Sequence, residues 1–132
     1  MKTYIVLLRG VMPTGKNKVP MDKLREALEN AKFSNVWTYI QSGNVLLTSN
    51  LLKDDIEHKV HRLIKKHIGV DLVIIAKTRR QLKTILDANP IKKKDMSQVF
   101  YTIFSKIPSK PKLCGFPGGC SDKELIIKNN AA

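Results

Sequence analysis

The sequence contains few cysteines and no long hydrophobic run. Two cysteines among 132 residues are too few for a disulfide scaffold. Cys114 and Cys120 have five residues between them, which does not match the two-residue gap of a zinc knuckle or a redox motif. No apolar segment approaches the ~20 residues of a membrane-spanning helix, and the first apolar run ends at Leu8, too short for a signal peptide. We therefore expect a cytoplasmic protein without a membrane partner.

Acidic residues are also scarce. The chain has 11 Asp and Glu residues against 24 Lys and Arg residues, a net charge of +13. A basic protein attracts polyanions, so nucleic acid is a candidate partner. The excess is spread along the chain, however, with +4 in residues 1–50 (seven basic, three acidic) and +9 in residues 51–132 (seventeen basic, eight acidic). The charge alone therefore indicates no single binding surface.

Hydrophobic patterning predicts six elements in residues 1–77. Strands are expected at 2–9, 36–40, 44–48 and 72–76, with helices from Pro20 to about residue 33 and from Ser49 or Asn50, as cap, to Gly69. The first strand is apolar on both faces and is expected to be central. The order strand, helix, strand, strand, helix, strand predicts an α+β fold with a ferredoxin-like βαββαβ core, an antiparallel sheet with helices on one face.

Three local features refine this core. Ser42-Gly43 predicts a two-residue hairpin turn between the second and third strands. Trp37 and Tyr39 fall on the second strand, which is expected at an edge of the sheet. The second helix is expected to turn one stripe inward, formed by Leu52, Ile56, Val60, Leu63, Ile64 and His67.

Residues 78–132 are expected to form an incomplete second α/β unit packed on the first as one domain. A helix is predicted from Thr78, with Gln81 completing a capping box, to the stop at Asn89-Pro90. A fifth strand is predicted over 98–104. The rest is rich in proline and glycine, with a short last strand at 125–127.

The loop after the first strand contains Gly10, four residues, Gly15 and Lys16, close to a nucleotide-hydrolase phosphate loop. That motif continues with Ser or Thr for magnesium, whereas this chain has Asn17, and Pro20 starts the helix about a turn too late. The loop is therefore predicted to bind an anion more weakly, or to be an exposed turn.

Strand order should bring this loop and the hairpin after the second strand to the same end of the sheet. Cations, amides and a hydroxyl beside a helix N-terminus suit a small anionic or phosphate-bearing ligand. The predicted ligand-binding residues are Arg9, Lys16, Asn17, Lys18, Gln41, Ser42 and Asn44. No catalytic residue and no cofactor is predicted.

Two other functions stay open. A nucleic-acid-binding module would use basic residues of the second helix and of the turn after the third helix: Lys59, Arg62, Lys65, Lys66, Lys92, Lys93 and Lys94. The aromatic platform of an RNA-recognition domain is missing, because the third strand has no aromatic residue. A phosphate-substrate enzyme would need an acid–base or metal group near Lys16. His58 and His67 lie about 180° apart on one helix, so no metal site is predicted there.

Several segments together resemble the bacterial family catalogued as domain of unknown function 1697. They are Leu7-Leu8-Arg9-Gly10, Gly15 to Met21, Phe33-Ser34-Asn35-Val36, and Thr38 to Val45. The resemblance implies an α+β protein with ferredoxin-like units and implies no activity. The family usually has Ile-Asn-Val-Gly at residues 11–14, and its members are longer. Either the chain is a shortened relative, or its last third packs differently, for example against another subunit in a homo-oligomer.

Overall fold

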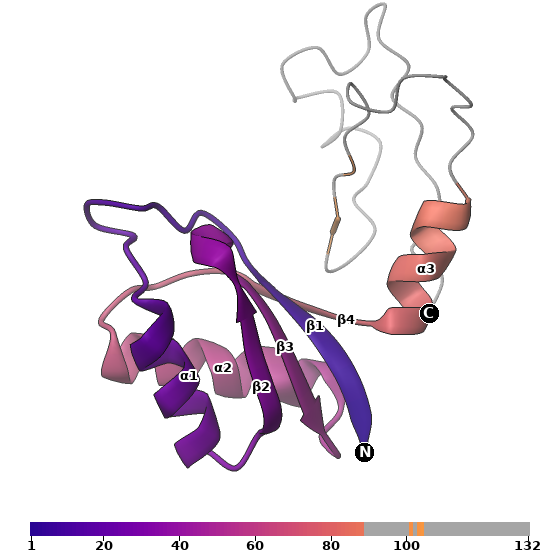
Figure 1. Cartoon of the computed structure of the whole chain (residues 1–132), viewed down its shortest axis with the longest axis horizontal. Helices are drawn as coiled ribbons and strands as arrows, with labels where there is room; N and C mark the ends of the chain where they lie inside the picture. Colours follow the sequence, from indigo (N-terminus) through magenta and orange to yellow (C-terminus); the bar gives the residue numbers. More distant parts are fainter. Residues whose placement is uncertain (89–100, 102, 105–132) are drawn as a thin grey trace, which may run out of the picture. The chain divides into compact units, whose positions relative to one another are not determined.

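The structure is a computed structural model that describes residues 1–88, 101, 103 and 104. Figure 1 shows the order of its elements along the chain. They are β1 (Lys2–Leu8), α1 (Met21–Asn30), β2 (Ser34–Tyr39), the short 3₁₀ helix Ile40–Ser42, β3 (Asn44–Ser49), α2 (Lys53–His67), β4 (Ile74–Thr78) and α3 (Arg79–Asp87). The chain divides into two compact units, Met1–Arg79 and Arg80–Ala132.

The four strands form one antiparallel sheet in the order β2-β3-β1-β4. β1 lies between β3 and β4, as its apolar character on both faces predicts, and β2 is an edge strand. In the register, Leu7 of β1 is opposite Asn44 of β3 and Ile75 of β4. The described residues thus form an α+β fold with a four-stranded antiparallel sheet and three α-helices.

One face of the sheet packs against α1 and α2, which lie next to each other in Figure 1. Alternate residues of β1 (Tyr4, Val6 and Leu8) are buried and share one core with residues of the two helices. The amphipathic spacing of the helices supplies the other half of this core: Leu24, Leu28, Ile56, Val60 and Ile64.

The other face of the sheet, here called the outer face, carries the intervening residues of each strand. Ile5 and Leu7 of β1 and Leu46 of β3 are half-buried on this face. Trp37 is opposite Leu46 and therefore lies on the outer face too, with 51% of its surface exposed. The outer face is thus apolar at its centre and aromatic along β2.

The structure corrects three expectations about element boundaries. α2 begins at Lys53 with Leu52 as its N-cap residue, and Ser49 instead accepts a 3.1 Å hydrogen bond from the N–H of Leu51. Leu52 and His67 are exposed and do not belong to the inward stripe. Leu52 precedes the first helical residue and His67 is the last one, so both lie beyond the buried residues Ile56, Val60 and Ile64. The hairpin connection is longer than two residues, since the 3₁₀ helix precedes Gly43.

The expectations beyond β4 are only partly covered by the described residues. α3 begins directly after Thr78 and ends at Asp87, before the predicted stop. Of the predicted strand 98–104, the structure describes Tyr101, Ile103 and Phe104, and none of these three lies in a strand. The basic turn at 92–94 and the last predicted strand lie outside the described residues. The predicted packing of the second unit on the first stays a prediction.

Candidate functional site

The C-terminal end of β1 lies between the β2–β3 connection and the segment that leads into β4. The backbone N–H of Leu8 donates a 2.9 Å hydrogen bond to the carbonyl of Gly43. The N–H of Arg9 donates a 2.9 Å hydrogen bond to the carbonyl of Val73. Three segments distant in sequence therefore meet at this end of the sheet, which we call the loop end.

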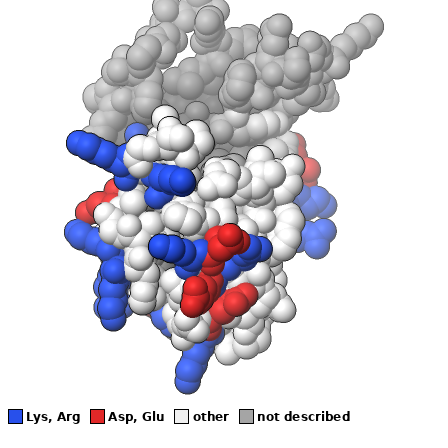
Figure 2. Space-filling model, turned by 60° about the vertical axis from the view of Figure 1, so that its left-hand side comes forward, with Lys and Arg blue, Asp and Glu red and all other residues white. Residues whose placement is uncertain are grey.

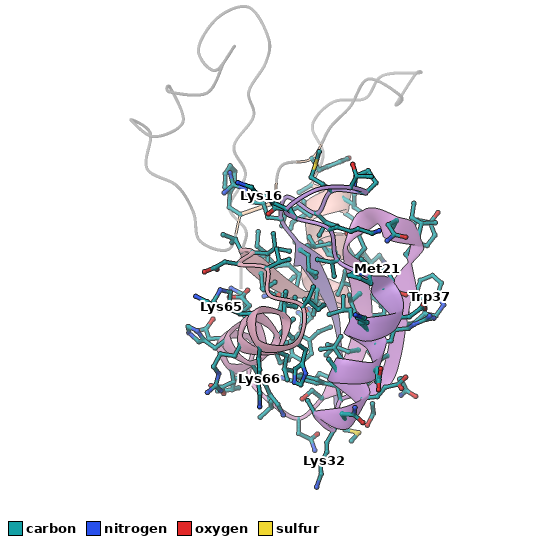
Figure 3. The ribbon with its side chains drawn as sticks, turned by 90° about the vertical axis from the view of Figure 1, so that its left-hand side faces the viewer. Lys16, Met21, Lys32, Trp37, Lys65 and Lys66 are labelled. Carbon is teal, nitrogen blue, oxygen red and sulfur yellow. The ribbon has the colours of Figure 1, made fainter. Side chains whose placement is uncertain are left out.

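The basic loop, residues 9–20, is closed by its own backbone. The N–H of Met12 donates to the carbonyl of Asn17 at 3.0 Å, and the N–H of Lys18 donates to the carbonyl of Gly15 at 3.2 Å. Gly15 sits in the left-handed region at φ +84°, which suits a tight turn. Lys16, at the turn, is exposed, and Figure 3 shows it at the opposite end of the unit from Lys32.

Gly43 is the residue of the hairpin that packs against the basic loop. Its φ is +74°, and a Cβ added there would lie 2.7 Å from Cγ2 of Val11 and 3.1 Å from Cβ of Leu8. Only a residue without a side chain fits both this backbone conformation and this close approach. The basic loop and the β2–β3 connection are therefore packed together through Val11, Leu8 and Gly43.

The predicted ligand-binding residues lie on the two segments that meet at the loop end. Arg9, Lys16, Asn17 and Lys18 are exposed on the basic loop. Gln41 and Ser42 belong to the 3₁₀ helix, and Asn44 is the first residue of β3. Backbone groups and Val11 make contacts between the two segments, and ligand binding by the side chains stays a prediction.

α1 follows the basic loop and begins at Met21, as the position of Pro20 predicts. Pro20 is the N-cap residue, and no side chain caps the first turn. The carbonyl of Pro20 accepts the first helical hydrogen bond, from Leu24 at 3.0 Å. The N–H groups of the first turn precede that bond and are not used by the helix itself. The helix begins five positions after Lys16, unlike the arrangement in a nucleotide-hydrolase loop.

The basic face of α2 is partly occupied by contacts within the protein. Nζ of Lys59 donates a 2.9 Å hydrogen bond to the carbonyl of Ala31 and lies 4.8 Å from the centroid of the Phe33 ring. Arg62 and Lys66 are exposed. Lys92, Lys93 and Lys94 lie outside the described residues. Figure 2 shows basic and acidic side chains interspersed on the visible face rather than gathered into one basic patch.

An ion cluster ties α2 to the segment before β4. Nζ of Lys65 lies 3.0 Å from one carboxylate oxygen of Asp71, and Nε2 of His61 lies 2.7 Å from the other. The hydrogen bond from His61, and then that from Lys65, hold the pKa of Asp71 below its usual range. His61 and Lys65 thus both contact one exposed carboxylate, and nucleic-acid binding by Lys65 stays a prediction.

The opposite edge of the sheet holds a charged group that pattern reasoning did not single out. Lys77 of β4 is only 4% exposed, and burial is the main cause that lowers its pKa, with the nearby Lys53 charge adding to it. A carboxylate oxygen of Glu57 accepts a 2.8 Å hydrogen bond from the N–H of Ala76 and lies 3.5 Å from Nζ of Lys53. Lys77 directly follows an apolar strand run, which was the available signal in the sequence.

Sequence reasoning also missed how far the aromatic residues of β2 are exposed. Trp37 and Tyr39 are 51% and 54% exposed, and their ring centroids are 5.8 Å apart at 44°. The signal was their i, i+2 spacing on a predicted edge strand, which places both rings on one face. Within the described residues, no helix combines the length and apolar character needed to cross a membrane.

Comparison with known proteins agrees with the motifs described above. No curated protein shows significant similarity to this chain. The conserved bacterial protein SP0830 from Streptococcus pneumoniae has a solved structure that is 30% identical in sequence, with a TM-score of 0.60. That similarity covers 67% of this chain and 49% of SP0830, so the chain spans about half the length of that relative. Residues 1–128 match a family described as protein of unknown function (DUF1697), and the chain belongs to this family.

Proposed function

We propose that this protein binds a small anionic, phosphate-bearing ligand at the loop end of its sheet. The observation that carries the proposal is the 2.9 Å hydrogen bond from the N–H of Leu8 to the carbonyl of Gly43, which holds the β2–β3 connection beside the start of the basic loop. Residues 9–20 contain three basic residues and no acidic one, and residues 40–44 are uncharged. Positive charge at this end is therefore not neutralised by neighbours in sequence.

The two segments would contribute different chemistry. The basic loop supplies point charges, and the hairpin supplies neutral donors, which together suit the several oxygens of a phosphate group. The uncapped first turn of α1 adds backbone N–H groups and the positive end of the helix dipole. The ligand would be held by Arg9, Lys16 and Lys18 through charge and by Asn17, Gln41, Ser42 and Asn44 through hydrogen bonds.

A thermal-unfolding screen with inorganic phosphate and ribose 5-phosphate tests the proposal. A ligand that binds only the folded state stabilises it by about 2.7 kcal/mol at a hundredfold excess over its Kd. We expect the wild type to show a concentration-dependent rise in Tm and Lys16→Ala to lose most of it. Lys66→Ala is the matched control, because Lys66 is an exposed lysine on α2. An equal rise in all three proteins, or none in any, would refute the proposal.

Binding to nucleic acid through α2 is the alternative that the same assays separate. The association constant of such binding falls steeply with salt concentration, with an exponent close to the number of phosphates contacted. The hydrogen bond from Lys59 to Ala31 leaves fewer cations on this helix face for a polyanion. Tight binding of mixed DNA or RNA at low salt, lost in Lys66→Ala and kept in Lys16→Ala, would support this alternative instead.

Two classifications belong to the same proposal. We assign the unit Met1–Arg79 to the ferredoxin-like folds, because its strand order β2-β3-β1-β4 with antiparallel neighbours agrees with that topology. We also place the protein in the cytoplasm.

An enzymatic role on a phosphate substrate would show as product release from any phosphate compound that raises the Tm.

A further inference from the structure

Two aromatic rings are exposed side by side on the outer face of β2. Trp37 and Tyr39 each expose about half of their surface. The centroids of their rings are 5.8 Å apart, and the ring planes are inclined at 44°. Large apolar rings are normally buried, and an exposed pair offers flat surfaces on which another ring can stack. The next residue, Ile40, is 69% exposed and has φ of +42°, a strained conformation for a β-branched residue.

This aromatic pair lies on the same face and at the same end of the sheet as Arg9. Tyr39 is opposite Asn44 of β3, and Asn44 is opposite Leu7 of β1, so one row crosses three strands on the outer face. The hydrogen bond from Arg9 to Val73 continues the β1–β4 ladder beyond Leu8. Because residues alternate between faces, Arg9 falls on the face of Leu7 and Tyr39.

The spacing between these groups suits a ligand that carries both a ring and a phosphate. Tyr39 and Arg9 are two strands apart, about 10 Å across the sheet, and Arg9 lies two residues beyond Leu7, about 7 Å along the strand, so their backbones are about 12 Å apart. Both side chains are long, and a base and a phosphate joined by a sugar can contact the two of them together. Base–aromatic stacking depends on the π-face rather than on sequence, so any base could occupy the pair.

We infer that the ligand of the loop end is a nucleoside phosphate, whose base stacks on the Tyr39 ring beside Trp37 while its phosphate contacts Arg9 and the basic loop. This inference rests on the proposed function and names its ligand class. A mononucleotide fits better than a nucleic-acid strand, because Figure 3 shows Trp37 on the opposite side of the view from Lys65 and Lys66. The basic helix face therefore does not continue the path that a polyanion would follow from the aromatic pair.

Trp37 provides a direct measurement, because it is the single tryptophan of the chain. AMP and GMP are titrated against the wild type while the tryptophan fluorescence is recorded, with ribose 5-phosphate as the ligand without a ring. We expect saturable quenching by the nucleotides and none by ribose 5-phosphate, which should bind about tenfold or more weakly because it lacks the stacking contribution. Thermal unfolding measures the affinity of the ligand that does not quench.

Three variants separate this inference from the proposed function. Tyr39→Leu should weaken AMP about tenfold and leave ribose 5-phosphate unchanged, because it removes a stacking surface and no charge. Arg9→Gln should weaken both ligands. Lys66→Gln, the control on α2, should change neither. Tyr39 and Arg9 are exposed, and an unchanged Tm without ligand checks that each variant is folded.

Each remaining outcome is decisive. Equal binding of AMP and ribose 5-phosphate, or full AMP binding by Tyr39→Leu, would overturn the nucleotide inference and leave the anion proposal standing. Equal binding of adenosine and AMP would refute the anion proposal, and no binding of any ligand would refute both. If oligo-dT binds far more tightly than AMP and its affinity falls steeply with salt, the ligand is a single-stranded nucleic acid and the mononucleotide inference is overturned.

Discussion

The backbone N–H of Leu8 donates a hydrogen bond to the carbonyl of Gly43, and the two residues are 35 positions apart. The bond continues the β1–β3 ladder beyond the last register pair, Leu7 with Asn44. It leaves Gly43 so close to β1 that an added Cβ would lie 3.2 Å from the carbonyl oxygen of Leu8. The relative position of the basic loop and the hairpin thus depends on a residue without a side chain.

Gly43→Ala should destabilise the fold more than Gly15→Ala does. Both glycines have positive φ, so each alanine costs about 1–2 kcal/mol in backbone strain. Only at Gly43 does the new Cβ meet neighbours, which should add about 1–3 kcal/mol. Urea unfolding of the two variants measures the difference. Val11→Ala should recover part of the loss in the Gly43→Ala background, and equal losses at the two glycines would contradict the packing argument.

Lys77→Met should stabilise the protein at pH 7 by about 1–2 kcal/mol, because it removes a charge from a buried position. Burial lowers the pKa of Lys77 from its ordinary 10.5, so between the two values the unfolded chain binds more protons than the folded one. Wild-type stability from this group therefore rises with pH across that window. The advantage of the variant should shrink as the pH approaches 10.5.

The measurement for Lys77 is the difference in unfolding free energy between variant and wild type at several pH values. Lys66→Met is the control, since Lys66 is exposed and should change stability by less than about 0.5 kcal/mol. A Lys77→Met variant that is less stable than wild type at pH 7 would show that the ammonium makes favourable contacts that outweigh its burial.

Lys59→Met should cost about 1–2 kcal/mol although it keeps the length of the side chain. The variant loses the hydrogen bond to the carbonyl of Ala31 at the end of α1 and the contact with the face of the Phe33 ring. Arg62→Met removes an exposed charge from the same helix and should have little effect. Chemical unfolding compares the two, and similar losses would mean that Lys59 is only a surface charge.

Asp71→Asn should lower the Tm slightly at pH 7, because it removes the ion cluster with His61 and Lys65. The hydrogen bonds depress the pKa of Asp71 in the folded state, so its contribution is present above the unfolded pKa and is lost as pH falls through the folded value. The Tm difference should therefore vanish in strongly acidic buffer. A difference that persists there would point to a cause other than the ionised carboxylate. High salt should also reduce the Tm difference between the variant and the wild type at pH 7.

Periodicity predicted the main elements of the first unit well. The apolar alternation of β1 and the amphipathic stripes of α1 and α2 arise from burial of one face, which is readable from residue spacing. The boundaries were less predictable: Leu52 replaced the expected polar cap of α2. Leu52 and His67 were wrongly placed on the inward stripe, because a helical pattern does not show where its helix leaves the core.

The candidate site was also predictable in part. Topology alone predicted that the basic loop and the hairpin lie at one end of the sheet, because a crossover helix makes the first two strands parallel. The close approach of Val11 to Gly43 had no signal beyond the glycine itself. The aromatic pair at Trp37 and Tyr39 was visible as a pattern, but its exposure depends on what the rest of the protein covers.

By itself the sequence determined the order of strands and helices, the central position of β1, the edge position of β2 and the family of the chain. The elements and their places in the sheet follow from local spacing, which decides which face of each element is apolar. The family follows from the resemblance of the quoted segments. Only the tertiary structure decided which distant groups touch: Leu8 with Gly43, Lys59 with Ala31, Glu57 with Ala76, and Lys77 in a buried position. Such contacts depend on register and on the packing of neighbouring elements, which residue spacing within one segment does not specify.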